Sequence, residues 1–88
     1  MAHTKVECPW GRKGAVMRRL TEKLRDGRIS LVDGIKVFLD RTEWVLVLPD
    51  AEEPLFHIHS EADNEERAAA LAAQYEDIVR ETVAEVAA

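Results

Sequence analysis

The sequence predicts an α+β fold, a two-layer sandwich in which helices cover one face of an antiparallel sheet, in the order α-β-β-β-α. Apolar residues recur with helical spacing near both ends of the chain, whereas the middle carries short runs typical of strands. The connections between the strands are too short for the crossovers that parallel pairing needs. With 88 residues, the chain fits one small domain, too small for a large catalytic cleft.

The first helix is expected over residues 12–25, where apolar side chains recur at four-residue spacing. They are Val16, Leu20 and Leu24, with Met17 on the same stripe. Gly27 is expected to end this helix as a left-handed C-terminal cap. Residues 1–10 are interpreted as an N-terminal lead-in to a folded unit of residues 11–88, since Pro9 precedes the helix and Trp10 can fold back on its first turn.

Three strands follow. The first covers "RISLVDGIKVFLD", with a bulge or bend at Gly34, and the second is "WVLVL", whose continuous apolar run predicts a central strand buried on both faces. The third, residues 55–60, alternates and places His57 and His59 on the same face. The last helix is expected to begin at an Asp63 N-cap with Glu66 completing a capping box. Its apolar stripe is Ala68, Leu71, Tyr75, Ile78, Thr82 and Val86.

The formal charge of −5 argues against nucleic acid and against an anionic membrane as partners. Residues 1–27 are nevertheless basic, with seven Lys or Arg against three acids. This first helix could face an acidic partner or loop, but we interpret its cations, including Arg12, Lys13, Arg18 and Arg19, as solvated. The single Cys8 cannot form an internal disulfide, which favours a cytoplasmic protein. No run is apolar enough to span a bilayer.

The words "DGIKV", "WVLVLPDAEEP" and "HIHSEA", followed by an amphipathic helix, resemble the C-terminal domain of the phosphoglucomutase and phosphomannomutase (α-D-phosphohexomutase) superfamily, over about residues 33–83. The resemblance implies a TATA-binding-protein-like fold. It also implies a domain that is not the catalytic unit, because the phosphoserine and the metal loop of that family lie in earlier domains. In the family this domain grips a sugar phosphate through a loop that reads Arg-Pro-Ser-Gly-Thr-Glu-Pro.

The corresponding loop here departs from the family at four of seven positions. Pro49, Glu53 and Pro54 keep the family residue, whereas Leu48, Asp50, Ala51 and Glu52 replace the arginine, serine, glycine and threonine. A guanidinium, hydroxyls and glycine-turn amides are what a phosphate dianion needs. We therefore predict that this degenerate loop does not bind phosphate and that the chain has no catalytic residue and no cofactor of its own.

The parent protein is expected to act in carbohydrate metabolism as a phosphohexomutase-like isomerase, with magnesium only in its other domains. The words "CPW", "KGAVMR" and "DGIKV" also look like a branch fused to a mannose-1-phosphate guanylyltransferase, which would place the parent in nucleotide-sugar synthesis. The expected partners are the other domains of the parent, with a second copy of the chain as another candidate. An interaction or assembly module is the alternative function.

Three further residue sets each allow a functional and a simpler structural interpretation. His57, His59 and Glu61 could hold a metal ion, but we favour a polar sheet face that looks toward solvent or neighbouring domains. Asp50, Glu52 and Glu53 lack the regular spacing of a calcium loop and are interpreted as a solvated turn. Cys8 paired with a histidine could form a nucleophile, but a small buried apolar role is the commoner one.

Overall fold

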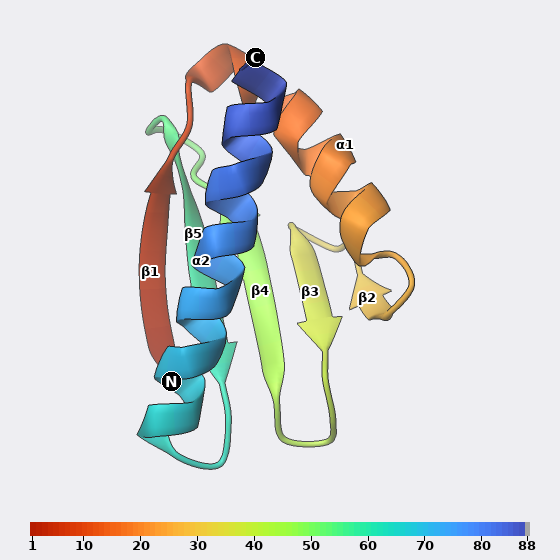
Figure 1. Ribbon diagram of the computed structural model, residues 1–88, viewed down its shortest axis with the longest axis vertical. Coiled ribbons are helices and arrows are strands. Elements are labelled where there is room, and N and C mark those ends of the chain that lie inside the picture. Colours follow the sequence, from red (N-terminus) through yellow and green to blue (C-terminus); the bar gives the residue numbers. More distant parts are fainter. Residues whose placement is uncertain (88) are drawn as a thin grey trace.

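The computed structural model describes residues 1–87 and shows two helices packed on one face of a five-stranded antiparallel sheet (Figure 1). The elements, in chain order, are β1 (Ala2–Glu7), the 3₁₀ helix η1 (Trp10–Arg12), α1 (Lys13–Leu24), β2 (Arg28–Ser30), β3 (Ile35–Phe38), β4 (Trp44–Pro49), β5 (Leu55–Glu61) and α2 (Glu65–Ala87). This architecture confirms the predicted α+β two-layer sandwich.

The strands lie in the order β1-β5-β4-β3-β2, so that β4 is central, as its apolar run predicts. Every neighbouring pair is antiparallel, and Val47 of β4 pairs with Ile35 on one side and Ile58 on the other. The short connections between β2, β3, β4 and β5 produce this meander. Only β1 is placed out of chain order, because it joins the far edge beside β5.

The N-terminal residues are part of the sheet, in contrast to the lead-in expected for residues 1–10. Ala2–Glu7 pair with β5, and Val6, opposite Phe56, is only 3% exposed. The sequence signal was weak because the strand lies at an edge and has one strongly apolar residue. Alternation is still present, since Thr4 and Val6 face the helices while His3 and Lys5 face the other way.

The segment expected to be one bent strand is a hairpin of two strands, β2 and β3. Asp33, at φ 65°, supplies the left-handed residue of the connection. Gly34 follows it where a Cβ atom would lie 2.5 Å from the carbonyl oxygen of Val47, so that only glycine fits against β4. The left-handed cap predicted at Gly27 is wrong, because no glycine among the described residues has a positive φ.

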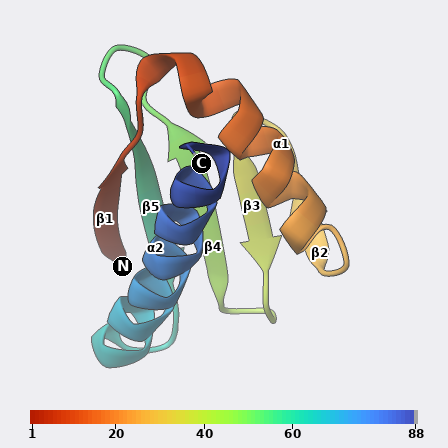
Figure 2. The same ribbon diagram turned by 45° about the horizontal axis from the view of Figure 1, so that its top comes forward.

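The core lies between the sheet and the helices, and Figure 2 shows α1 and α2 side by side over it. Its largest fully buried side chains include Phe56 and Ile58 from β5, Leu20 from α1 and Leu71 from α2. Helix α2 begins one residue later than predicted, because Asn64 rather than Asp63 caps it by accepting a hydrogen bond from the Arg67 amide at 2.8 Å. Neither described helix is both long and apolar enough to cross a membrane.

Within residues 1–87, α1 and α2 both lie on one face of the sheet, and no helix covers the opposite face (Figure 1). The prediction that β4 is buried on both faces is therefore wrong: Val45 and Val47 are buried, whereas Trp44, Leu46 and Leu48 are only half-buried. We call this second surface the open face; it comprises the outward residues of the strands, including the histidines of β5.

Candidate functional site

The β4–β5 loop is a tight connection between Pro49 and Leu55. The amide of Asp50 donates to the carbonyl oxygen of Leu55 at 3.0 Å and so closes the hairpin. At the other side, the Cys8 amide donates to the carbonyl oxygen of Pro54 at 2.9 Å, which ties the loop to the end of β1. The loop is thus held by backbone contacts from two strands, although residues 51–54 are themselves exposed.

The side chain of Asp50 occupies the amides at the loop tip. Its Oδ1 atom accepts hydrogen bonds from the backbone amides of Glu52 and Glu53, both at 2.8 Å. Its Oδ2 atom lies 2.6 Å from Nε2 of His57. The hydrogen bond with His57 and then those with the two amides hold the pKa of Asp50 well below its usual range. The Asp50 carboxylate therefore accepts the hydrogen bonds of both of these loop amides.

Lys13 holds the loop from the helix side. Its ammonium donates to the carbonyl oxygens of Asp50 at 2.6 Å and Glu53 at 2.5 Å, and the residue is 8% exposed. The same ammonium lies 3.7 Å from the ring centre of Trp10. This corrects one expectation, since Lys13 is not solvated; Trp10 contacts the first residue of α1, as expected, but remains 54% exposed.

The other cations of α1 fall into two groups. Arg19 and Lys23 both form ion pairs with Glu85 of α2, at 3.1 and 2.9 Å. Arg18 is exposed, as expected from the sequence, and Arg12, the last residue of η1 rather than a residue of α1, is half-buried. Among residues 1–87, the side-chain hydrogen bonds between α1 and the β4–β5 loop are those of Lys13.

A cluster of three histidines lies on the open face beside the loop. His57 and His59 are there as predicted, but the third member is His3 from β1, directly opposite His59 in the strand register. One ring nitrogen of each histidine lies within 4.8 Å of those of the others. Glu61, the third ligand considered from the sequence, is not a member of this group and pairs instead with Trp44.

The three imidazoles are in direct contact. Nε2 of His3 lies 2.9 Å from Nδ1 of His57, and the rings of His3 and His59 stack with centres 4.3 Å apart and planes 7° apart. Burial first, and the neighbouring histidines next, lower the pKa values of His3 and His59. The positive charge of Lys5 also lowers the pKa of His3. Near neutral pH, His3 and His59 are therefore uncharged and can act as ligands.

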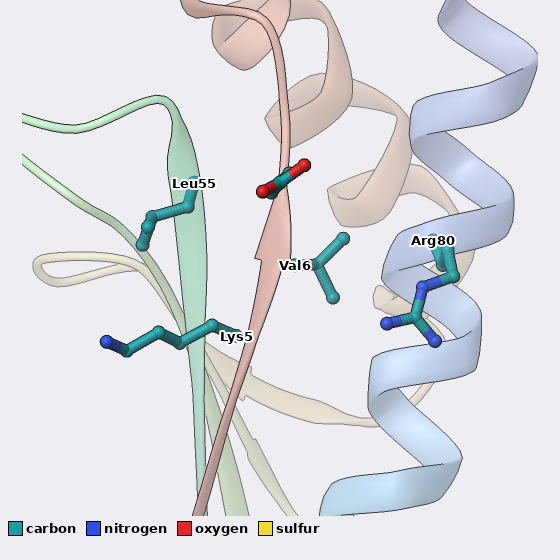
Figure 3. A pocket seen from close by; sticks show the side chains of 5 residues that line it. Lys5, Val6, Leu55 and Arg80 are labelled. Atoms are coloured by element: carbon teal, nitrogen blue, oxygen red, sulfur yellow. The ribbon is translucent and has the colours of Figure 1, made fainter.

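The remaining candidates have structural explanations. Cys8 is 1% exposed, and burial raises the pKa of its thiol, so it is the small buried apolar residue that was expected. A hollow at the end of β1 is divided by the strand: Figure 3 shows Val6 and Arg80 on the helix side and Lys5 and Leu55 on the other. Neither feature brings reactive groups together.

Comparison with known proteins finds two relatives that are both named probable phosphoglucosamine mutase. It is 48% identical over 83 residues to a probable phosphoglucosamine mutase of Methanopyrus kandleri, and this match covers 92% of the chain. A probable phosphoglucosamine mutase of Methanothermobacter thermautotrophicus is 38% identical over 69 residues, or 73% of the chain. The chain spans only 18% and 15% of the lengths of these two relatives. No family model matches the sequence.

Proposed function

We propose that this chain, which belongs to the phosphohexomutase family, is a non-catalytic C-terminal domain whose phosphate loop no longer binds phosphate. The observation that carries the proposal is the position of the Asp50 carboxylate, which accepts the amides of Glu52 and Glu53. A phosphate would have to displace this carboxylate from within its own loop. The hydrogen bond from His57 opposes that displacement, because it holds the second carboxylate oxygen.

The electrostatics of the loop point in the same direction. Asp50 and Glu52 stand where the family has hydroxyl groups, and each would repel a phosphate by about 1 kcal/mol at 4 Å in water. The cation nearest the loop, Lys13, is directed at two carbonyl oxygens rather than at the solvent side. Leu48, at the family's arginine position, is a half-buried apolar residue of the open face.

The role in a larger protein is part of the same proposal. The parent is a phosphohexomutase-like protein that handles a hexosamine phosphate, in keeping with the names of both relatives. Magnesium and the reacting groups are then supplied by other domains, which this chain contacts. A parent of the guanylyltransferase type and a cytoplasmic location remain predictions from the sequence.

A titration followed by NMR tests the loop proposal. Glucosamine 1-phosphate, glucosamine 6-phosphate and inorganic phosphate are added to the ¹⁵N-labelled 88-residue chain. We expect no saturable shifts at residues 48–54 up to about 10 mM ligand. A dissociation constant at this limit corresponds to a binding free energy of only about 3 kcal/mol. Saturable shifts confined to this loop would contradict the proposal.

A restored loop provides the positive control. The variant Leu48→Arg, Asp50→Ser, Ala51→Gly, Glu52→Thr carries the family sequence and should bind the same ligands with saturable shifts. Its net charge rises by three, so the matched control Glu22→Gln, Asp26→Asn, Glu81→Gln changes the charge equally at exposed sites. Binding by the restored loop but not by this control would assign the effect to the loop chemistry.

An assembly role is the second candidate, and the open face favours it. Trp44, Leu46 and Leu48 lie there half-buried in the central strand, with no helix over them. Such a surface would gain free energy by packing against a neighbouring domain or a second copy of the chain. Sedimentation equilibrium distinguishes these cases. Concentration-dependent dimerisation that Leu46→Lys abolishes would indicate self-assembly. A chain that stays monomeric and also fails to bind the separated parent domains would exclude self-assembly and domain docking alike.

A further inference from the structure

We propose that His3, His57 and His59 form a binding site for a divalent transition-metal ion, best suited to Zn²⁺, with Asp50 as its outer hydrogen-bonding partner. This proposal is independent of what the β4–β5 loop binds. It rests on the convergence of three imidazoles on the open face, where one ring nitrogen from each lies within 4.8 Å of the others. Imidazole nitrogens are common ligands of zinc in proteins.

The strands place the three histidines on a firm support. His57 and His59 are two residues apart on β5, so both project from the same face. His3 reaches them from β1, where it is the register partner of His59. The strands pair from Ala2–Ser60 to Glu7–Leu55, and the buried Val6 anchors β1 to the core. Ligands on paired strands are held more closely than ligands on a loop.

The hydrogen bond between Asp50 and His57 prepares one ligand. The Asp50 carboxylate, 2.6 Å from Nε2 of His57, can only accept a hydrogen bond, so Nε2 is the ring nitrogen that donates to it. Nδ1 of His57 then presents its lone pair toward His3, 2.9 Å away. A histidine that coordinates with one nitrogen and donates from the other to a carboxylate is the usual arrangement at zinc sites.

Binding needs a rotation of the exposed His3 side chain, because its ring stacks on that of His59 with planes 7° apart and lone pairs in parallel planes do not meet at one ion. In the metal-free arrangement, its Nε2 donates the hydrogen bond to Nδ1 of His57; on binding, the proton moves to Nδ1 of His3, which frees Nε2 as a ligand. Two nitrogens at tetrahedral zinc are about 3.3 Å apart for zinc–nitrogen distances of about 2.0 Å. The His3 and His57 nitrogens therefore separate by a few tenths of an ångström, which the exposed His3 side chain permits.

The fourth position is left for water or another ligand, since the group of convergent ligands in residues 1–87 comprises these three histidines. The charges near the site act in opposite directions. Asp50 favours a cation, whereas Lys5, the register partner of His57, disfavours one. Removal of the Lys5 charge should accordingly strengthen binding.

Calorimetry and spectroscopy on the 88-residue chain without a polyhistidine tag test the site. Zn²⁺ titrated at pH 7.5 should bind with one-to-one stoichiometry, and Co²⁺ should give the intense visible bands of a four-coordinate ion. In NMR spectra, Zn²⁺ should shift the ring resonances of all three histidines together. The absence of a saturable one-to-one isotherm below about 1 mM Zn²⁺ would overturn the proposal. A dissociation constant of this size corresponds to a binding free energy of about 4 kcal/mol.

Variants identify the ligands. His3→Gln and His59→Gln should each weaken Zn²⁺ binding at least tenfold, whereas Glu61→Gln should leave it unchanged. Asp50→Asn keeps an acceptor for the loop amides but turns an amide N–H toward His57, which should reverse the tautomer and weaken binding about 10- to 100-fold. Far-UV circular dichroism establishes that each variant is folded. Equal affinity in the His3→Gln variant, or a loss in Glu61→Gln equal to that in His59→Gln, would contradict this ligand set.

Discussion

The ammonium nitrogen of Lys13 lies 2.6 Å from the carbonyl oxygen of Asp50, a residue 37 positions later in the chain. This contact joins the start of α1 to the β4–β5 loop, and a second hydrogen bond to the carbonyl oxygen of Glu53 completes it. A lysine is rarely buried unless its three donors find acceptors. The loop is therefore shaped from two sides, by Lys13 at its carbonyl oxygens and by Asp50 at its amides.

Replacement of Lys13 by methionine should lower the free energy of unfolding by about 1–3 kcal/mol, because two loop carbonyl oxygens lose a charged donor. Methionine keeps most of the aliphatic length that packs near Trp10. Urea denaturation at pH 7 measures the change. The control Arg18→Met alters an exposed cation of the same helix and should change stability by less than about 0.5 kcal/mol. Equal losses of stability in the two variants would contradict a stabilising role for the hydrogen bonds from Lys13 to the loop.

Gly34→Ala should destabilise the domain, because the new Cβ would lie 2.5 Å from the Val47 carbonyl oxygen, a backbone atom of the central strand. Separation of β3 from β4 at this point should cost about 1–3 kcal/mol, as overpacking typically does. Thermal unfolding measures the loss. Gly11→Ala is the matched control, since nothing lies within 4 Å of its Cβ position. An unchanged melting temperature in Gly34→Ala would show that the strands can part without cost.

Asp40→Asn should flatten the dependence of stability on pH below about pH 4. The backbone amide of Thr42 is the first cause that holds the pKa of Asp40 below its reference of 3.8. The unfolded chain therefore takes up the proton first as the pH falls, so this stabilisation is present above pH 3.8 and lost below it. Asparagine keeps an acceptor oxygen but does not titrate. Urea unfolding midpoints of both proteins are measured from pH 6 to pH 2. Parallel curves of midpoint against pH would contradict this account.

Val6→Ala tests whether β1 belongs to the folded unit. Val6 is 3% exposed, and removal of its two methyl groups should cost about 2 kcal/mol. Lys5→Ala, at the neighbouring position on the open face, should change stability by less than about 0.5 kcal/mol. Chemical denaturation compares the two variants. A negligible loss in Val6→Ala would mean that β1 is only loosely attached.

The sequence predicted the elements whose periodicity is strong. The four-residue spacing of Val16 and Leu20 and the apolar run of β4 identified α1 and the central strand correctly. The predictions failed where a pattern is short or carries one apolar residue, as in β1, or where a turn interrupts a continuous alternation, as at Asp33. The helix cap was misplaced by one residue, since Asp63 and Asn64 are both good N-caps and only the chain path selects between them.

For the site, local sequence determined the composition of the loop and the common face of His57 and His59, because both follow from neighbouring positions in one strand. Tertiary structure alone decided that Lys13 clamps the loop, that Asp50 contacts His57 and that His3 stands opposite His59. These contacts join residues 37, 7 and 54 or more positions apart in the chain. Residues with these sequence separations come into contact only through sheet pairing and helix packing. Both depend on the burial of the whole core rather than on any local pattern.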